Sequence, residues 1–372
     1  MQLGKLSIVA TLAIASMNAY GEDSINFEVL HYSENDSRTQ VIAPSIEVNK
    51  DFGTDYTLNV SVVADSVSGA SPTYYRTDTA SGASAYSRGT TANSNIKKGN
   101  ITYEEQRTAL SANLTTRFDN RDELKTGINL SGEHDFYSGE LSGSYMHYLD
   151  SSHNQSISFG GSIQNNQILV KTDTTSGASE KKTNTGFTGQ IGFSQVLNQN
   201  SVANIGTFFT KESGYMSSPY HNIVREINAT TSVEAEKKPE SKTAYGIKLG
   251  LISALGETLT THLDYRYYSD DWGIASHTLD SLLYYELTGK ITLGGGVRYY
   301  TQTQADFFKE KFTTEQFASS DERFDAFHGI TYKGSFDYKL SEKLSYNFGV
   351  SLYDQSTGLQ ALSFTTGIQY KF

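Results

Sequence analysis

The sequence predicts an all-β fold, a closed antiparallel transmembrane β-barrel of about sixteen strands behind an N-terminal signal peptide. Three observations predict it. Segments of about ten residues alternate between apolar and polar side chains along most of the chain. The connections between these segments alternate between short polar turns and longer loops. The chain also ends on such a segment, and its last residue is the aromatic Phe372.

Composition and charge exclude several classes of protein. The 372 residues carry a formal net charge of −11 and include four prolines and no cysteine. After the N-terminal segment, no apolar run reaches the roughly 18 residues that a membrane-spanning helix needs. A barrel is compatible with this polarity, because half of each transmembrane strand faces a polar lumen. The acidic balance argues against nucleic acid as a partner, and the missing cysteines fit an exported protein without disulfides.

The N-terminus has the features of a secretory signal peptide over residues 1–21. An apolar run from Leu6 to Ala15 is followed by small residues that end in Ala19-Tyr20-Gly21, a small-x-small cleavage site. Cleavage two residues earlier is one alternative, and a buried N-terminal helix is the other. We expect export of the chain and a mature barrel over residues 22–372, located in the outer membrane of a Gram-negative bacterium.

The predicted strands can be followed in order from this point. In each one the apolar residues occupy every second position, so they share one face. These faces are Ile25–Val29, Ile42–Val48, Tyr56–Val62, Leu110–Thr116, Leu124–Leu130, Leu141–Tyr145, Ile157–Ile163, Phe187–Phe193, Ala203–Phe209, Tyr245–Leu251, Leu259–Tyr267, Leu279–Tyr285, Ile291–Tyr299, Ile330–Tyr338, Leu344–Leu352 and Phe364–Phe372. The ninth is the least clear, because Phe208 interrupts its polar face. A further strand within Asn222–Glu234 leaves the count open by two.

The connections predict which end of the barrel carries the loops. Short turns rich in Asp, Asn and Gly lie at Asp51–Asp55, Asp119–Asp122, Asp150–Asn154, Leu197–Ser201, Ala254–Thr258, Thr288–Lys290 and Leu340–Lys343. Between them we expect long extracellular loops near residues 66–99, 171–184, 213–241 and 303–322. An even strand count then places both termini in the periplasm.

The closing strand predicts how the barrel meets lipid and is assembled. Phe364, Thr366, Ile368, Tyr370 and Phe372 share one face, and small or polar residues occupy the other. This ending looks like the closing strand of a bacterial outer-membrane barrel. We therefore expect outer-membrane lipid around the barrel, and we expect the barrel assembly machinery to read Phe372 as an assembly signal. Aromatic girdles are expected at Tyr265, Tyr267, Tyr299, Tyr332, Tyr338 and Phe372.

Charged residues on the polar faces are the candidate lining of the lumen. Such residues are expected to face the lumen, because an Arg or Lys that faces lipid at the membrane midplane destabilises a barrel by roughly 2–4 kcal/mol. The candidates are Glu47, Arg107, Arg117, Lys125, Glu133, Lys248, Asp264, Arg266, Asp280, Arg298, Lys333 and Asp337. One interpretation is a water-filled, weakly selective pore. The other is a lumen plugged by an inserted loop such as Ser66–Gly99, in which the charges pair structurally.

The residues that enzymes use are not arranged for catalysis. There is no Gly-x-Ser-x-Gly motif, and Ser276 and His277 lie on opposite faces of one strand. His147, His277 and His328 fall on apolar faces near strand ends, which favours an interfacial position. No metal, haem or phosphate motif is found, and acidic residues of the loops such as Asp270 favour solvated surface over cation binding. The sequence predicts no catalytic, cofactor or metal site, and no enzyme.

Five stretches of the sequence indicate a particular protein family, which the overall composition cannot do. They are Asp65–Pro72, Gly214–Tyr220, Tyr265–Thr278, Val297–Tyr300 and Gln304–Phe308. Together they resemble the bacterial family called domain of unknown function 3570, over nearly the whole mature chain. The motif residues are Asp65, Gly69, Pro72, Pro219, Tyr265, Arg266, Asp271, Trp272 and Gly273. The resemblance implies an outer-membrane barrel with no settled activity. Members are often encoded near envelope flavin-transfer and thioredoxin-like proteins, which implies a possible periplasmic partner.

The hairpin at Tyr265–Thr278 has a direct physical interpretation. Arg266 is expected in the lumen near Asp264, where it could pair with Asp280 on the next strand. Asp270–Gly273 is expected to form a tight turn with Trp272 at the membrane interface. A hairpin fixed for folding and a ligand site are both compatible with this pattern.

Two functions follow from these expectations. The first is porin-like passage of small polar solutes through a polar lumen. The second is a non-conducting barrel that acts as a scaffold or binding component of an envelope assembly, which the resemblance links to redox chemistry.

Overall fold

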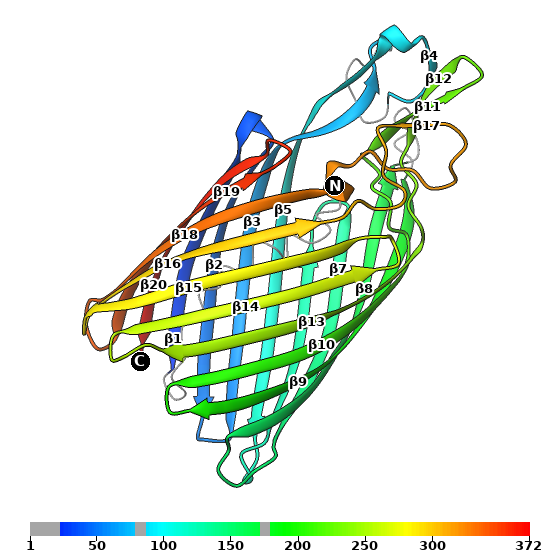
Figure 1. Cartoon of the computed structure of the whole chain (residues 1–372). Coiled ribbons are helices and arrows are strands. Elements are labelled where there is room, and N and C mark those ends of the chain that lie inside the picture. Colours follow the sequence, from blue (N-terminus) through cyan, green and yellow to red (C-terminus); the bar gives the residue numbers. More distant parts are fainter. Residues whose placement is uncertain (1–22, 79–86, 172–178) are drawn as a thin grey trace.

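Sixteen antiparallel strands form a closed barrel in the computed structural model (Figure 1), which confirms the predicted fold class and strand count. The structure describes residues 23–78, 87–171 and 179–372. Around the barrel the strands follow one another in chain order, apart from four short strands that form a separate sheet. Closure is made by β1 and β20, where Ile25 pairs with Tyr370 and Phe27 with Ile368. The last predicted strand therefore closes the barrel against the first.

The barrel strands are longer at the loop end than their apolar faces alone predicted. Their bounds are β1 Ser24–Glu34, β2 Thr39–Phe52, β3 Tyr56–Arg76, β5 Ile96–Arg117, β6 Glu123–Gly132, β7 Phe136–Tyr148, β8 Gln155–Lys171, β9 Ser179–Asn198, β10 Ser201–Gly214, β13 Ser241–Ala254, β14 Leu259–Asp270, β15 Ala275–Thr288, β16 Ile291–Gln302, β18 Phe327–Lys339, β19 Leu344–Gln355 and β20 Gln360–Lys371.

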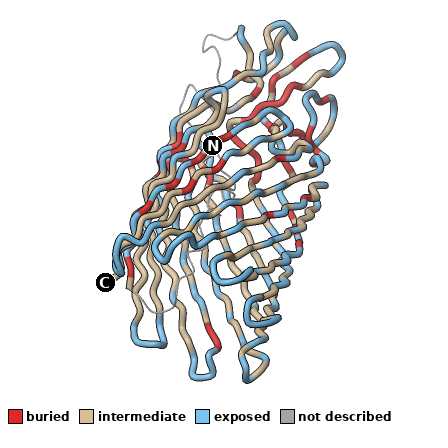
Figure 2. The backbone as a smooth tube through the Cα atoms, turned by 60° about the vertical axis from the view of Figure 1, so that its left-hand side comes forward, coloured by how far each residue is buried: buried red, intermediate tan, exposed pale blue. Residues whose placement is uncertain are grey.

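The outward face of the barrel is apolar. Large side chains that the alternation assigns to one face are strongly exposed, as at Leu141 (55%) and Ile163 (57%). Aliphatic and aromatic side chains exposed in this way on every barrel strand are what a lipid-facing band requires. Figure 2 shows buried residues gathering toward the end of the barrel with the long loops, with exposed residues alternating along the strands below. The barrel therefore has the architecture of an outer-membrane protein.

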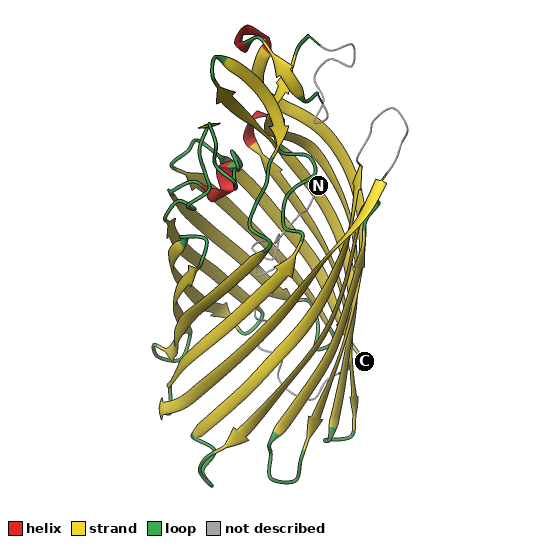
Figure 3. Cartoon of the chain, turned by 90° about the vertical axis from the view of Figure 1, so that its right-hand side faces the viewer, coloured by secondary structure: helices red, strands yellow, loops and turns green. Residues whose placement is uncertain are grey.

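The two ends of the barrel differ, as Figure 3 shows: short turns close one end and the loops gather at the other. At the short-turn end the last residue of the chain meets the first described one, since the backbone carbonyl of Asp23 accepts a hydrogen bond from the Phe372 backbone N–H at 3.0 Å. Phe372 itself is 51% exposed there. The ends are called the short-turn end and the mouth below.

Four short strands lie outside the barrel as a second sheet in the order β17-β11-β12-β4. The hairpin of β11 (Asn222–Ile227) and β12 (Thr230–Ala235) is its centre. β17 (Lys311–Phe312) and β4 (Gly89–Thr91) flank it. The stretch that left the strand count open is therefore a hairpin of this sheet and no part of the barrel.

The described part of the hairpin between β3 and β5 does not enter the lumen. β3 and β5 stay paired up to Arg76 and Ile96, and they stand beyond the rim of the barrel as an arm (Figure 1). Insertion of Ser66–Gly99 as a plug was therefore wrong for the described part of this segment. The reason is physical: a continuous ladder satisfies the backbone hydrogen bonds of both strands outside the barrel.

The expected signal peptide, residues 1–21, lies outside the described residues. No helix in the part of the chain that the structure describes is long and apolar enough to cross a membrane.

Candidate functional site

The lumen has two unlike walls. The first, called the charged wall, is the lumen-facing surface of β10, β13, β14, β15, β16 and β18. Seven of the predicted lumen residues lie on it, namely Lys248, Asp264, Arg266, Asp280, Arg298, Lys333 and Asp337. All seven alternate with the exposed apolar residues that face outward, such as Leu263 and Val297. Lys248, Asp264 and Arg266 are themselves exposed, so side chains do not fill the lumen at their level.

Asp280 is the centre of an ion cluster on this wall. It is 8% exposed and pairs with Arg298 at 2.9 Å and Lys333 at 2.6 Å. The expected pairing of Arg266 with Asp280 was wrong. Arg266 lies opposite Thr278 in the strand register, two pairs further toward the mouth than Asp280, and two cations from the other side already surround that carboxylate.

Arg266 instead packs on aromatic rings. Its guanidinium lies 5.0 Å from the Phe208 ring centroid and 5.8 Å from that of Tyr268. The Lys248 ammonium lies 5.7 Å from the same Phe208 ring. Lys248 and Arg266 are direct cross-strand neighbours on β13 and β14. The residue that interrupted the polar face of its predicted strand, Phe208, is thus the platform for two cations.

The second wall, called the amide wall, faces the charged wall across the lumen. It consists of Asn59, Asn113, Asn129, Ser142, Ser158 and Gln190, on β3 and β5 to β9. Amides on neighbouring strands are hydrogen bonded: the Asn59 amide donates to Asn49 and Glu47 at 2.8 Å each. This wall therefore offers mainly amide and hydroxyl donors and acceptors, with the Glu47 carboxylate beside Asn59.

The remaining predicted lumen charges lie toward the ends of the barrel. Near the mouth, Arg107 binds the buried Asp65 at 2.5 Å. At the short-turn end, Arg117 and Lys125 lie 3.6 and 3.8 Å from Glu123. The lumen-facing cations of these strands therefore have carboxylate neighbours.

The mouth carries a folded loop unit, defined here as residues 213–241 and 303–326. Its core consists of Met216, Ala305, Phe307 and Phe308 together with Trp272 from the β14–β15 turn. Trp272 is 7% exposed, and its indole N–H donates to the Ser241 carbonyl at 2.9 Å. The expected interfacial position of Trp272 was therefore wrong.

Gly273 explains how the tryptophan turn fits this core. It adopts a φ of +86°, and a Cβ there would lie 2.5 Å from the Asp306 carboxylate of the neighbouring loop. Asp270 caps the turn by accepting hydrogen bonds from the backbone N–H groups of Trp272 and Ile274 at 3.0 and 3.1 Å. The turn is tight, as expected, but it is built to meet a loop and not lipid.

Buried charges hold the loop unit together. Glu236, 4% exposed, pairs with Lys238 at 3.0 Å and accepts a hydrogen bond from the Ser319 hydroxyl at 2.6 Å. Asp321 pairs with Arg323 at 2.5 Å. Burial alone would raise the pKa of Asp321, but Arg323 and the nearby His221 hold it well below its ordinary value. Each ion pair lies within one loop, and the Ser319–Glu236 hydrogen bond together with His221, 3.9 Å from Asp321, joins the two loops of the unit.

The loop unit is tied to several points of the barrel rim. Glu322 contacts Arg38 in the β1–β2 turn at 3.1 Å and Lys98 on β5 at 3.2 Å, beyond the closing strands β19 and β20 from β18. The Asn222 backbone N–H donates to the Thr73 hydroxyl of the β3 arm at 2.8 Å. These contacts attach the loop unit to rim segments of β1 to β5, which are not its neighbours in the chain.

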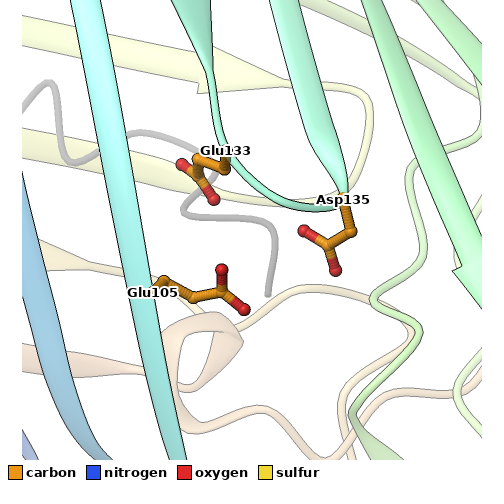
Figure 4. Close-up of side chains that lie close together, drawn as sticks. All are labelled: Glu105, Glu133 and Asp135. Carbon is orange, nitrogen blue, oxygen red and sulfur yellow. The ribbon is translucent and has the colours of Figure 1, made fainter.

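Three carboxylates meet below the loop unit (Figure 4). Glu105 on β5 and Glu133 and Asp135 in the β6–β7 turn place oxygens within 4.8 Å of one another. Tyr220 of the loop unit hydrogen bonds to Asp135. Glu133 is 6% exposed, its Oε2 has no hydrogen-bond partner among the described residues, and burial raises its pKa to about 7.

These three are the described residues whose carboxylates could hold one metal ion together. Sequence reasoning named Glu133 as a lumen residue but did not find the cluster. The two acids of the turn are separated from Glu105 by a whole hairpin, so no local spacing reveals the group.

The residues of the family motifs gather near the mouth. Asp65, Gly69 and Pro72 lie on β3 where it enters the arm. The Pro219 carbonyl accepts a hydrogen bond from Arg88 at 2.8 Å, and Asp271 accepts one from the Thr243 backbone N–H at 2.9 Å. Tyr265 faces outward and contacts His277 at 2.7 Å. Most of these residues join segments of the mouth, and Arg266 is the one on the charged wall.

The expected interfacial histidines lie on the outward face. His147 contacts Asp122 in a short turn at 2.8 Å, and His328 stacks on Tyr299 at 6.4 Å between ring centroids. Ser276 is buried at 6% exposure on the inner face, so Ser276 and His277 do not meet.

Among solved structures the chain is similar to the ferric enterobactin receptor PfeA of Pseudomonas aeruginosa, with a TM-score of 0.46 and 11% identity over 90% of this chain and 54% of that one. This chain thus spans about half the length of the receptor. It is also similar to the monoaromatic hydrocarbon channel CymD (TM-score 0.44, 10% identity, 94% and 88% covered). A third is the P. putida toluene transporter TodX (0.42, 10%, 94% and 90%).

None of the curated proteins matches the sequence. A family model covers nearly the whole chain, from residue 5 to residue 371. The family is the one that the motif stretches resemble. The chain therefore belongs to the family described as Protein of unknown function (DUF3570).

Proposed function

We propose that this barrel resides in the outer membrane and passes small polar solutes through its lumen. The observation that carries the proposal is the exposure of Lys248, Asp264 and Arg266, which face the lumen. Inward-facing charges that stay exposed need water beside them, since burying an unpaired charge is costly. A barrel of sixteen strands is also wide enough to leave an aqueous channel. The proposal assigns no catalytic step to the chain.

The location follows the same reasoning. The chain is made with a signal peptide over residues 1–21, which export removes, and the mouth with its loop unit faces the exterior. The loop unit then narrows the outer entrance without a plug from the β3–β5 arm. Outer-membrane fractionation and N-terminal sequencing of the mature protein test this placement, and a mature protein that begins with Met1 would contradict it.

Passage is tested by reconstituting the full mature chain in planar lipid bilayers. We expect discrete conductance steps from the wild type. A second variant, in which a short Gly-Ser linker replaces residues 304–320, removes the centre of the loop unit and should give larger steps. Silence of both folded proteins would contradict passage, whereas silence of the wild type alone would mean that the loop unit closes the entrance.

A second function is favoured by one observation, the folded sheet of β4, β11, β12 and β17 that stands beyond the rim. Such a surface suits a barrel that serves as a binding component of an envelope assembly. A periplasmic partner would instead contact the short-turn end. Gentle purification from outer membranes distinguishes these cases: a stoichiometric partner supports the assembly, and a lone barrel that conducts supports passage.

We also propose that the barrel assembly machinery recognises the closing strand through Phe372. The ring is 51% exposed at the short-turn end. Deletion of Phe372 should reduce the amount of barrel in the outer membrane more than it changes the conductance of those barrels that insert. The matched control is deletion of the exposed Tyr137 side chain by Tyr137→Ala, which removes an outward aromatic ring near the mouth. Equal insertion of the Phe372 deletion and the wild type would contradict this role.

A further inference from the structure

Lys248 and Arg266 differ from the other cations predicted to line the lumen. Arg298 and Lys333 share Asp280, Arg117 and Lys125 flank Glu123, and Arg107 binds Asp65. Within the part of the chain that the structure describes, no carboxylate lies within ion-pair distance of either Lys248 or Arg266. The two cations are instead direct neighbours across β13 and β14.

Such a pair works against the stability of the barrel. Like charges directly opposite each other on neighbouring strands destabilise a sheet. A sequence that keeps such a conflict at one place, while it pairs the neighbouring cations, follows the pattern of a functional site. The charges also keep their water, because both residues are exposed to the lumen.

Aromatic rings hold the two cations in place without neutralising them. Phe208 lies beneath both, with its ring 5.0 Å from the Arg266 guanidinium and 5.7 Å from the Lys248 ammonium. Tyr268 stacks beside Phe208 at 6.4 Å between centroids, with 25° between the ring planes. A cation over a ring face is attracted to it but keeps its N–H groups available to a ligand.

The glycine opposite Phe208 makes this arrangement possible. Gly246 pairs with Phe208 in the strand register, and a Cβ at Gly246 would lie 2.6 Å from the Phe208 ring. The missing side chain lets the ring of Phe208, from β10, lie against β13 at Gly246. The platform is thus built from three adjacent strands.

We infer that Lys248 and Arg266, held on Phe208 and Tyr268, form a binding site for the oxyanion group of a small solute, a carboxylate or a phosphate. The guanidinium fork and the ammonium together present several N–H donors to one anionic group. The inference names a substrate class for the proposed passage and rests on it, although binding itself does not require conduction.

The residues around the site favour weak binding of an anion, as passage requires, over tight binding. β14 runs from the short-turn end toward the mouth, so Asp264 lies one step below Arg266 on the same face. A carboxylate at that position repels a bound anion and limits its affinity. A channel needs binding that is favourable enough for entry and weak enough for exit.

The test is calorimetric titration of the folded full mature barrel in detergent with inorganic phosphate and, separately, with acetate, at constant chloride. The test variant is the double substitution Lys248→Gln with Arg266→Gln. The matched control is Lys125→Gln, which also removes a lumen-facing cation. We expect measurable binding to the wild type and to the control. In the double variant we expect binding weakened by about tenfold or more, the loss that follows when charged hydrogen-bond donors are removed.

Each outcome decides something. Binding of phosphate alone or of acetate alone supports the site and identifies its oxyanion. No binding to the wild type, or equal binding to the wild type and the double variant, overturns the site. Heat-modifiable electrophoretic migration confirms that each variant is a folded barrel. Bilayer recordings separate this inference from passage: binding by barrels that stay silent with and without residues 304–320 contradicts passage and leaves the site, whereas conductance without binding contradicts the site alone.

Discussion

The charged wall and the amide wall face the same lumen, yet they are built in different ways. On the charged wall, Asp280, Arg298 and Lys333 form one ion cluster, and Lys248 and Arg266 share an aromatic platform. On the amide wall, neutral groups such as Asn59 and Asn49 bond to one another across strands. The lumen-facing cations in the middle of the strands therefore lie on one side, whereas the other side carries mainly amides with the Glu47 carboxylate beside them. The comparison shows that the charge of a polar lumen can differ from one wall to the opposite wall as well as from one end to the other.

The largest effect is expected from charge reversal on the charged wall. Lys248→Glu with Arg266→Glu replaces two cations by two anions beside Asp264. We expect the reversal potential in a salt gradient to move strongly toward cation preference, because the local field changes sign. The matched pair on the other wall is Asn113→Glu with Asn129→Glu, which adds two anions where no cations are lost. An equal shift in both pairs would contradict the asymmetry of the walls.

The next effect concerns the stability of the ion cluster. Asp280→Asn leaves Arg298 and Lys333 without their carboxylate, and we expect a loss of about 1–3 kcal/mol of barrel stability. Asn59→Ala removes hydrogen bonds to the neutral Asn49 and to the half-buried Glu47, and it should cost less, about 1 kcal/mol. Urea unfolding in detergent micelles measures both. If Asn59→Ala cost more than Asp280→Asn, the cluster would not be the stronger element.

A smaller effect is expected on the pH dependence of barrel stability, and it arises from Glu133 in the β6–β7 turn. Burial raises the pKa of Glu133 from its ordinary 4.5 to about 7. The folded state therefore holds this proton more tightly than the unfolded state, and this contribution to stability is complete below pH 4.5 and is lost as pH rises through about 7. Glu133→Gln should remove this part of the pH dependence and unfold at higher temperature than the wild type above pH 7.

The control for this prediction is Glu104→Gln, which neutralises an exposed carboxylate on β5 next to Glu105. Melting curves followed by heat-modifiable migration between pH 4 and pH 9, run in the presence of a chelator, measure the difference. A Glu133→Gln barrel with the same pH profile as the wild type would show that burial does not perturb this carboxylate.

The smallest effect is expected at the short-turn end. Lys125→Gln removes a cation whose side chain is 56% exposed. An exposed ion pair contributes about 0–1 kcal/mol, so stability and reversal potential should both change little. A shift as large as that from the double substitution at Lys248 and Arg266 would mean that total lumen charge, and not its placement on one wall, controls selectivity.

Much of the fold could be predicted because its signal is local. A strand with one polar and one apolar face alternates every two residues, and about ten residues are enough to reveal this pattern. The outward faces and the short turns follow from that pattern alone. The even strand count and the position of Phe372 followed from the same reasoning. The length of the arm could not be predicted in this way, because β3 and β5 continue past the apolar face that marks the membrane.

The mouth could be predicted less well because its contacts join distant segments. Trp272 is apolar and lies in a hairpin turn, which favoured the lipid interface. Its actual neighbours, Met216 and Phe307, come from two other loops. Arg266 and Asp280 are on adjacent strands, which favoured a pair, but the strand on the other side of Asp280 supplies Arg298. In both places the competing partner was visible only once strand register and loop packing were known.

The most direct test of this account is the single-channel current of the purified full-length mature barrel in planar bilayers, recorded in a salt gradient with the wild type and the Lys248→Glu, Arg266→Glu variant side by side. The account predicts discrete conductance steps in both and a reversal potential that moves toward cations in the variant. It would be contradicted by two folded barrels that conduct with the same reversal potential, or by silence that persists after removal of residues 304–320.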